Sequence, residues 1–168
     1  MIRPIFRLGD EALYMTSETV ARDEVPALLD TVKDLHDTLM DFRAKYGAGR
    51  AIAAPQIGIS KRLIYVHIDQ PVLLFNPSLR FPDDEKMIIL DDCMSFPHLL
   101  VRVQRYRRCV VTYFDENWQM NTWKLEGDLS ELLQHEYDHL DGILATMRAV
   151  DCKAFIAKEA SDYGPFFN

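Results

Sequence analysis

The sequence predicts an α+β fold in which most of the strands run antiparallel. Three features support this prediction: a long stretch with a helical period of apolar residues, six short runs rich in β-branched and aromatic residues, and a second helical stretch after them. The chain of 168 residues contains no internal repeat or low-complexity linker. We therefore expect a single domain, residues 1–168, with one sizeable core.

The first helix is predicted over residues 25–42. Apolar side chains recur there at steps of three and four residues, which gives a helix one buried stripe: Val25, Leu28, Leu29, Val32, Leu35, Leu39 and Phe42. Gly47 and Gly49 follow this stretch and are expected to end the helix.

Six strands are predicted in the middle of the chain. The runs that predict them lie at residues 63–66, 72–75, 87–90, 101–103, 109–114 and 118–124. Residues 115–117 (DEN) separate the last two runs and indicate a hairpin turn, which favours antiparallel pairing. Asn76 and Pro77, and then residues 81–84 (FPDD), are expected to break the chain into loops.

A second helix is predicted after Gly127. Leucines keep a helical period through it and are expected to anchor it in the core: Leu129, Leu132, Leu133 and Leu140. Gly142 is expected to end this helix. Residues 150–160 are expected to form a short last helix, and residues 163–168 a loose end.

The balance of charges disfavours nucleic acid as a partner. The chain has 19 Lys and Arg residues against 26 Asp and Glu residues, a net charge of −7 at pH 7. No stretch approaches the roughly 18 apolar residues that a membrane-spanning helix needs, and the N-terminus has no apolar signal-peptide region. We expect a cytoplasmic protein with no membrane partner, and the sequence leaves its oligomeric state open.

Residues 135–139 (HEYDH) indicate a metal site on the second helix. Histidines four residues apart project from one face of a helix, so His135 and His139 can bind one metal ion. Glu136 then lies beside the ion, where a general base acts on metal-bound water. The alternative is a helical histidine pair satisfied by local hydrogen bonds. The first interpretation predicts a metal-dependent hydrolase.

Cys93 is the candidate for a third metal ligand. A thiolate with two imidazoles leaves the fourth coordination position open for water. The alternative is that Cys93 is one more small buried residue of the core. Cys109 and Cys152 are expected to play no part in a site, and an odd number of cysteines without dense spacing indicates reduced thiols.

Three separated segments together resemble the peptide deformylase family. Residues 49–56 (GRAIAAPQ) resemble its G-x-G-x-A-A-x-Q motif, residues 91–95 (DDCMS) resemble E-G-C-L-S, and residues 135–139 match H-E-x-D-H. Their order and spacing agree with the family, and the similarity extends over nearly the whole domain. The resemblance implies mixed, mainly antiparallel strands packed around a central metal-bearing helix.

The resemblance also implies a reaction, the removal of an N-terminal formyl group as formate. The substrate would be a formyl-methionyl peptide or a related N-formyl amine. Cys93, His135 and His139 would hold one divalent metal ion, Fe²⁺ in typical members, although Zn²⁺, Ni²⁺ or Co²⁺ suit the same ligands. Glu136 would act as general base and then general acid. The side-chain amide of Gln56 and the backbone N–H of Met94 would stabilise the oxyanion.

The sequence departs from the family pattern around the expected substrate cleft. After Gly49 come Arg50, in place of an apolar residue, and Ala51, in place of a glycine. Asp92 replaces the glycine before the cysteine, and Met94 replaces a leucine. The Cβ atoms of Ala51 and Asp92 can obstruct a close approach of substrate.

Arg50, Asp91 and Asp92 are expected to form a charged rim that shifts the substrate preference away from a thioether side chain. The alternative is that Arg50 and Asp92 point to solvent and change nothing. Asp91 also replaces the family's glutamate and is expected to pair with Arg105, which would orient the loop that carries the cysteine.

Two other functions remain open at this stage. A zincin-like metalloprotease also uses H-E-x-x-H, but its third ligand usually lies downstream of the helix, where this chain offers only Glu159 and Asp162 in a weakly patterned tail. A non-catalytic deformylase-like binding protein would keep the fold, but binding alone would not require Glu136.

Overall fold

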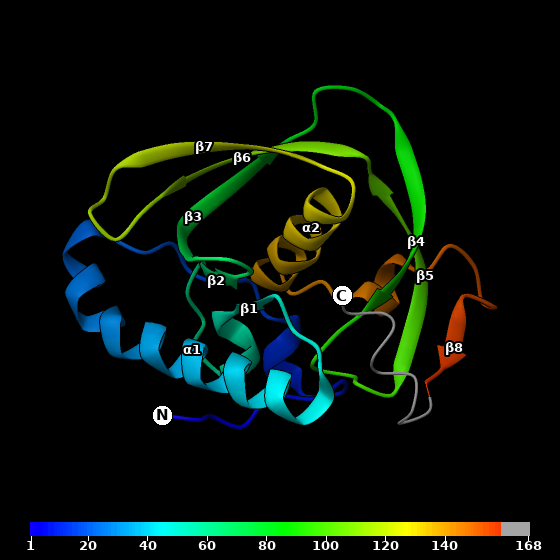
Figure 1. Cartoon of the computed structure of the whole chain (residues 1–168), viewed down its shortest axis with the longest axis horizontal. Coiled ribbons are helices and arrows are strands. Elements are labelled where there is room, and N and C mark those ends of the chain that lie inside the picture. Colours follow the sequence, from blue (N-terminus) through cyan, green and yellow to red (C-terminus); the bar gives the residue numbers. More distant parts are fainter. Residues whose placement is uncertain (159–168) are drawn as a thin grey trace.

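Helix α2 (Asp128–Leu140) runs through the middle of the molecule, between two antiparallel sheets (Figure 1). The computed structural model describes residues 1–158. The larger sheet has the strand order β1-β2-β3-β6-β7, with β1 (Ala51–Ala53), β2 (Leu63–His67), β3 (Pro71–Arg80), β6 (Arg108–Phe114) and β7 (Met120–Glu126). The smaller sheet has the order β4-β5-β8, with β4 (Lys86–Asp92), β5 (Leu99–Tyr106) and β8 (Phe155–Ala157). The predicted α+β class with mainly antiparallel strands is confirmed.

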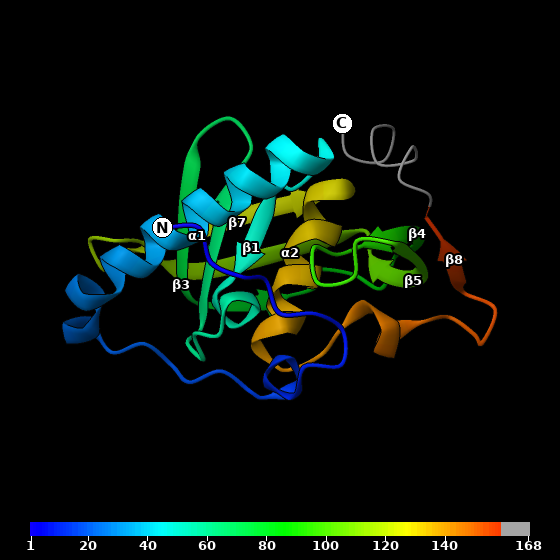
Figure 2. The same cartoon turned by 90° about the horizontal axis from the view of Figure 1, so that it is seen from below.

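Helix α1 (Val25–Tyr46) and helix α2 lie on opposite faces of the larger sheet, as Figures 1 and 2 show. Consecutive strand residues point to opposite faces. In β1, accordingly, Ile52 packs in the core under α1, whereas Ala51 and Ala53 pack in the core under α2. Residues 1–158 also contain four short 3-10 helices: Glu11–Tyr14, Arg22–Glu24, Ala54–Ile57 and Ala145–Arg148.

Helix α1 is one turn longer than predicted. It ends at Gly47, whose φ of 67° is left-handed and whose N–H donates to the Arg43 carbonyl at 2.8 Å. Leu35, Leu39 and Phe42 are buried as expected. Leu29 is 43% exposed, so its predicted place in the buried stripe is wrong.

Strand β3 continues through Asn76 and Pro77, where a loop was predicted. The pairing with β6 shifts register between Phe75 and Ser78, and Asn76 has a φ of 48°. Such a bulge accommodates the missing N–H of proline, and asparagine tolerates the left-handed conformation. The Asn76 side chain also accepts a hydrogen bond from the Val20 N–H and donates one to the Val20 carbonyl, both at 2.8 Å.

Three other expectations about the strands need correction. Strand β1 was not predicted, because its three residues include two alanines, which give little strand signal. Residues 150–158 contain no helix; Phe155–Ala157 pairs with β5 as strand β8, at the edge of the smaller sheet (Figure 2). The predicted loose end at residues 163–168 lies outside the described residues.

Strand β7 was predicted to begin at residue 118, but it begins at Met120. The turn before it is wider than predicted, because the Asp115 side chain accepts the N–H groups of Asn117 and Gln119, both at 2.9 Å.

Two features fix the position of helix α2. The Gln134 side chain accepts the Tyr106 N–H at 2.9 Å and donates to the Tyr106 carbonyl at 2.8 Å, which ties the helix to β5. Beyond its C-terminal end, a Cβ on Gly142 would lie 2.4 Å from the Tyr14 carbonyl oxygen, so the chain needs glycine there. Neither helix of the described chain combines the length and the apolar character needed to cross a bilayer.

Replacing Asn76 with alanine is expected to destabilise the protein by about 2–3 kcal/mol. The substitution removes two hydrogen bonds to the buried Val20 peptide and leaves an alanine with positive φ. Urea unfolding followed by circular dichroism measures the loss. Asn117→Ala is the control, because Asn117 is exposed and only its backbone N–H bonds to Asp115. Equal losses in the two variants would contradict the role given to Asn76.

Candidate active site

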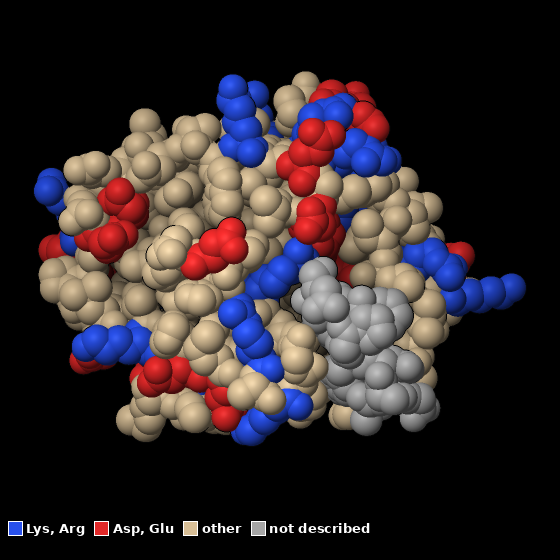
Figure 3. All heavy atoms as spheres, in the orientation of Figure 1, with Lys and Arg blue, Asp and Glu red and all other residues tan. Residues whose placement is uncertain are grey.

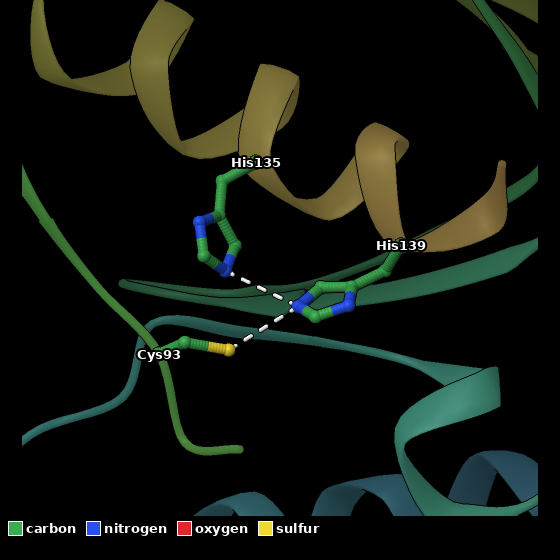
Figure 4. Close-up of side chains that lie close together, drawn as sticks. All are labelled: Cys93, His135 and His139. Atoms are coloured by element: carbon green, nitrogen blue, oxygen red, sulfur yellow. Dashed lines mark hydrogen bonds between the residues drawn. The ribbon is translucent and has the colours of Figure 1, made fainter. Parts of the chain in front are cut away.

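The two histidines of helix α2 meet a cysteine from the end of the smaller sheet. His135 and His139 lie one turn apart, and their Nε2 atoms are 3.2 Å from each other. Cys93 follows the last residue of β4, and its Sγ lies 3.3 Å from the His139 Nε2 (Figure 4). All three side chains are buried, and their ligand atoms lie within 4.8 Å of one another.

The spacing of these three atoms fits a metal ion. For metal–sulfur and metal–nitrogen distances of about 2.3 and 2.0–2.1 Å, the edges of a tetrahedron are about 3.3–3.6 Å. Two of these edges, Nε2 to Nε2 at 3.2 Å and Sγ to Nε2 at 3.3 Å, are close to this range. One thiol and two imidazoles are also the donor types that divalent transition metals prefer.

The two imidazoles differ in their electrostatic environment. Burial by itself would lower the pKa of His135, but the charges of Asp91 and Cys93 outweigh it and raise the pKa well above its usual range. Burial and the neighbouring His135 lower the pKa of His139. The pKa values of the two imidazoles are therefore shifted in opposite directions.

Arg105 on strand β5 lies behind the histidines and joins two buried aspartates. Its guanidinium donates to Asp91 at 2.9 Å and also to Asp138, which stands between the two histidines in sequence. Asp91 Oδ1 in turn lies 2.7 Å from the His135 Nδ1. Arg148 completes the cluster by donating two hydrogen bonds to Asp138, both at 2.7 Å. The structure thus contains the Asp91–Arg105 pair that was predicted from the sequence. The prediction that Asp91 contributes to a charged rim is wrong, because the residue is 1% exposed.

Glu136 and Gln56 lie beside the cysteine and the histidines. Burial raises the pKa of Glu136 to about 7, and its Oε2 has no hydrogen-bond partner among the described residues. The Oε1 of Gln56 accepts the Ala53 N–H at 2.9 Å, so the other end of the amide, Nε2, points to the Cys93 Sγ at 3.6 Å. The carbonyl of Met94 accepts a hydrogen bond from Arg7 at 2.6 Å, which fixes the loop after the cysteine.

These groups open onto one cavity of about 50 Å³. It is lined by Phe42, Gly49, Arg50, Ala51, Gln56, Asp92, Cys93, Met94, Glu131, Leu132, His135 and Glu136. His139, Asp91 and Arg105 lie outside the lining. Gly49 has a φ of 114°, and a Cβ there would come within 3.0 Å of Leu39, which explains a glycine at this point of the wall.

Sequence reasoning missed one charged residue of this cavity, Glu131. It lies one helical turn before His135 and therefore on the same face of α2, a spacing visible in the sequence. Arg50 donates to Glu131 at 3.4 Å and to Asp128 at 3.2 Å. Burial and the charge of Asp91 raise the pKa of Glu131 to about 7, so its surroundings disfavour the ionised form of this side chain.

Neither of the other two cysteines belongs to the site. Cys109 is buried in the core between the larger sheet and α2, and Cys152 is exposed.

On the face drawn in Figure 3, acidic and basic side chains are interspersed over the surface.

A cysteine and two histidines of an H-E-x-x-H helix, clustered beside a cavity that a buried glutamate also lines, define the site of a metal-dependent hydrolase. The family model for polypeptide deformylase matches residues 2–155. The chain belongs to the polypeptide deformylase family.

Individual relatives agree with this assignment. The chain is 42% identical over 141 residues to a peptide deformylase of Treponema pallidum (strain Nichols), covering 82% of each chain. The crystal structure of peptide deformylase from Thermotoga maritima matches 90% of this chain and 99% of its own, with a TM-score of 0.81 and 30% identity. A class I type b peptide deformylase from Acinetobacter baumannii, solved with Met-Ala-Ser bound, matches 88% of this chain and 98% of its own, with a TM-score of 0.79 and 27% identity.

Replacing Arg105 with leucine is expected to destabilise the protein by about 3–5 kcal/mol, because two buried carboxylates lose their shared cation. The matched control is Arg108→Leu. Arg108 also pairs with several carboxylates, including Asp83 and Glu126, but at the surface, so its loss should cost far less. Chemical unfolding of both variants tests the difference, and a similar loss in each would show that burial of the Arg105 cluster is unimportant.

Proposed function

We propose that this chain hydrolyses the formyl group of N-formyl peptides, releasing formate and a free amino terminus. The observation that carries the proposal is the convergence of Cys93, His135 and His139 beside a cavity that Cys93, His135 and Glu136 line. Membership of the polypeptide deformylase family supports the same reaction. The relative from Acinetobacter baumannii binds Met-Ala-Ser, a peptide of the kind that such a reaction would leave as product.

Cys93, His135 and His139 are the proposed ligands of one divalent metal ion. When bound, the ion supplies a Lewis acid that lowers the pKa of water and polarises a carbonyl group. We propose Fe²⁺, on the basis of the family resemblance, because the donor set itself also suits Zn²⁺, Ni²⁺ and Co²⁺. A thiolate ligand needs a reducing environment, which supports the cytoplasm as the place of the reaction.

Glu136 is the proposed proton carrier. Its Oε2 is buried and without a partner among the described residues, so it is available to a water molecule or substrate in the cavity. Hydrolysis of a formamide requires one proton to leave the attacking water and one to reach the departing nitrogen. One carboxylate beside the reacting atoms can take the first proton and donate it to the nitrogen.

Gln56 and Met94 are the proposed stabilisers of the oxyanion. Gln56 has its amide oxygen occupied by the Ala53 N–H, which leaves Nε2 as the end directed to the cysteine side of the cavity. The backbone at Met94 is held by Arg7. Donors that are fixed before the reaction need no reorganisation when negative charge develops on the formyl oxygen.

Asp91 and Arg105 are proposed to orient the ligands from behind. A carboxylate at the Nδ1 of His135 favours the tautomer whose Nε2 lone pair is available for a metal. Arg105 holds that carboxylate in place. Neither residue needs to contact substrate.

The family assignment does not favour the two alternatives. A zincin-like metalloprotease would need a third ligand downstream of α2, whereas the described cluster takes it from Cys93, upstream. A binding protein without catalysis leaves the buried Glu136 carboxyl without an evident role.

Protein loaded anaerobically with Fe²⁺ is expected to release formate from formyl-Met-Ala-Ser, because the site then has its metal, base and oxyanion donors. Formate is measured with a coupled dehydrogenase, and mass spectrometry should show the internal peptide bonds intact. Cys93→Ser should lose most bound metal and activity, whereas Cys109→Ser, a matched change at a buried cysteine outside the site, should keep both. Cleavage of internal bonds, or metal retained by Cys93→Ser, would contradict the proposal.

Glu136→Gln is expected to lower kcat by at least about a hundredfold while metal content stays unchanged, because the variant keeps the ligands and loses the proton carrier. Turnover of formyl-Met-Ala-Ser and metal analysis of the same samples test this separation. Glu126→Gln, an equal change of charge on the exposed side of β7, should leave kcat unchanged. A Glu136→Gln enzyme with more than a tenth of the original kcat would exclude the proposed role.

A further inference from the structure

The wall of the active-site cavity carries charged side chains where a thioether would need apolar ones. Arg50 stands just before β1, Asp92 ends β4, and Glu131 lies on α2 one turn before His135, so the three reach the cavity from different elements. They share the lining with Phe42 and Leu132, so apolar surface is present but interrupted.

Among the described residues that line the cavity, Arg50 carries the guanidinium, and this group already forms two ion pairs. Arg50 donates to Glu131 at 3.4 Å and to Asp128 at 3.2 Å. The Glu131 side chain is 13% exposed, whereas Asp128 is 79% exposed and lies at the outside of the pair. Arg50 therefore spans from the cavity to solvent, and its positive charge is shared between two carboxylates.

Two carboxylates and one guanidinium form the charged part of this wall next to the catalytic groups. The Asp92 side chain is 30% exposed and forms a long ion pair, at 3.8 Å, with Lys158. Among the described residues, Glu131 forms its ion pair with Arg50, which also pairs with Asp128. Apart from Glu136, the lining thus holds two carboxylates and one guanidinium that is also paired outside the cavity.

This distribution of charge penalises an apolar occupant. A butyl or thioether side chain would remove water from Asp92, Glu131 and Arg50 without replacing its hydrogen bonds. A side chain that ends in an ammonium group would donate hydrogen bonds to the two carboxylates and offset part of their negative charge. Sites built around buried polar groups discriminate strongly against ligands that leave those groups unpaired.

We infer that this cavity selects N-formyl substrates whose first side chain carries a cationic, hydrogen-donating group, through the carboxylates of Glu131 and Asp92. The inference rests on the proposed function and specifies the substrate class of that site. Glu131 and Asp92 are then specificity-determining residues, whereas the hydrolysis itself depends on Cys93, the histidines and Glu136.

Two peptides of nearly equal shape test the inference. Formyl-ornithyl-Ala-Ser and formyl-norleucyl-Ala-Ser differ in one terminal group, an ammonium in the first and a methyl in the second. With metal-loaded enzyme we expect kcat/KM to be at least about tenfold higher for the ornithyl peptide, mainly through a lower KM. Formyl-glutamyl-Ala-Ser is the third substrate and should be the poorest.

Variants locate the effect. Glu131→Gln should reduce the ornithyl-to-norleucyl ratio about tenfold, and Glu131→Leu should reverse the preference, because the wall gains apolar surface and loses a carboxylate. Glu126→Gln changes the net charge equally on the exposed side of β7 and should leave the ratio unchanged. Circular dichroism and metal content confirm that each variant is folded and loaded.

The outcomes separate this inference from the proposed function. Formate release with the norleucyl peptide equal or preferred would overturn the inference and leave the function standing. A preference for the glutamyl peptide would assign selectivity to Arg50 and also overturn it. An equal shift in Glu126→Gln and Glu131→Gln would show a long-range charge effect instead. If no peptide releases formate, both the function and the inference fail.

Discussion

The site depends on one buried arginine that joins its two halves. Arg105, on β5, pairs with Asp91 two residues before the cysteine and with Asp138 between the two histidines. The cysteine loop and the histidine helix are far apart in sequence, so a contact to both is what keeps their ligand atoms within reach of one ion. A buried charge of this kind is tolerated only when its partners are also in place. The arrangement therefore forms as a unit, since a misplaced loop would leave Arg105 unpaired.

Helix α2 has two buried faces of opposite character. Leu132, Leu133 and Leu140 pack in the core under the larger sheet, while His135, Glu136, Asp138 and His139 are buried on the sides that meet the smaller sheet and the cavity. Burying polar groups costs free energy unless they find hydrogen-bonding partners. A helix face that buries several of them therefore indicates a functional site rather than a packing surface. The leucines give the rigidity, and the smaller sheet brings Asp91, Cys93 and Arg105 to the polar side. Because one face of α2 is anchored by leucines and the other meets the smaller sheet, the catalytic groups can be buried and still well oriented.

Local patterns predicted the elements well, and non-local contacts account for the failures. The period of α1 and the alternation in β6 are visible in the sequence, but β3 passes through Asn76 and Pro77 only because Val20 binds the asparagine side chain. Strand β8 forms because β5 has a free edge with which residues 155–157 pair, and the sequence of these residues alone does not predict a strand. Asp91 and Asp92 were expected together at the rim, yet adjacent strand residues point to opposite faces, so one contacts His135 and the other lines the cavity.

Asp128 and Glu131 can be explained in two ways, by stabilisation of α2 or by a role in binding substrate. Both lie in the first turn of the helix, where negative side chains interact favourably with the positive end of the helix dipole. That interaction alone would explain acidic residues at these places without any role in binding. It cannot explain why Glu131 faces inward, 13% exposed, when an outward carboxylate such as Asp128 serves the dipole at a smaller desolvation cost. A helix-stabilising effect changes the unfolding free energy and leaves the relative rates for two isosteric substrates equal, whereas a selecting carboxylate changes those relative rates. The inward placement of Glu131 is thus better explained by what enters the cavity than by the helix that carries it.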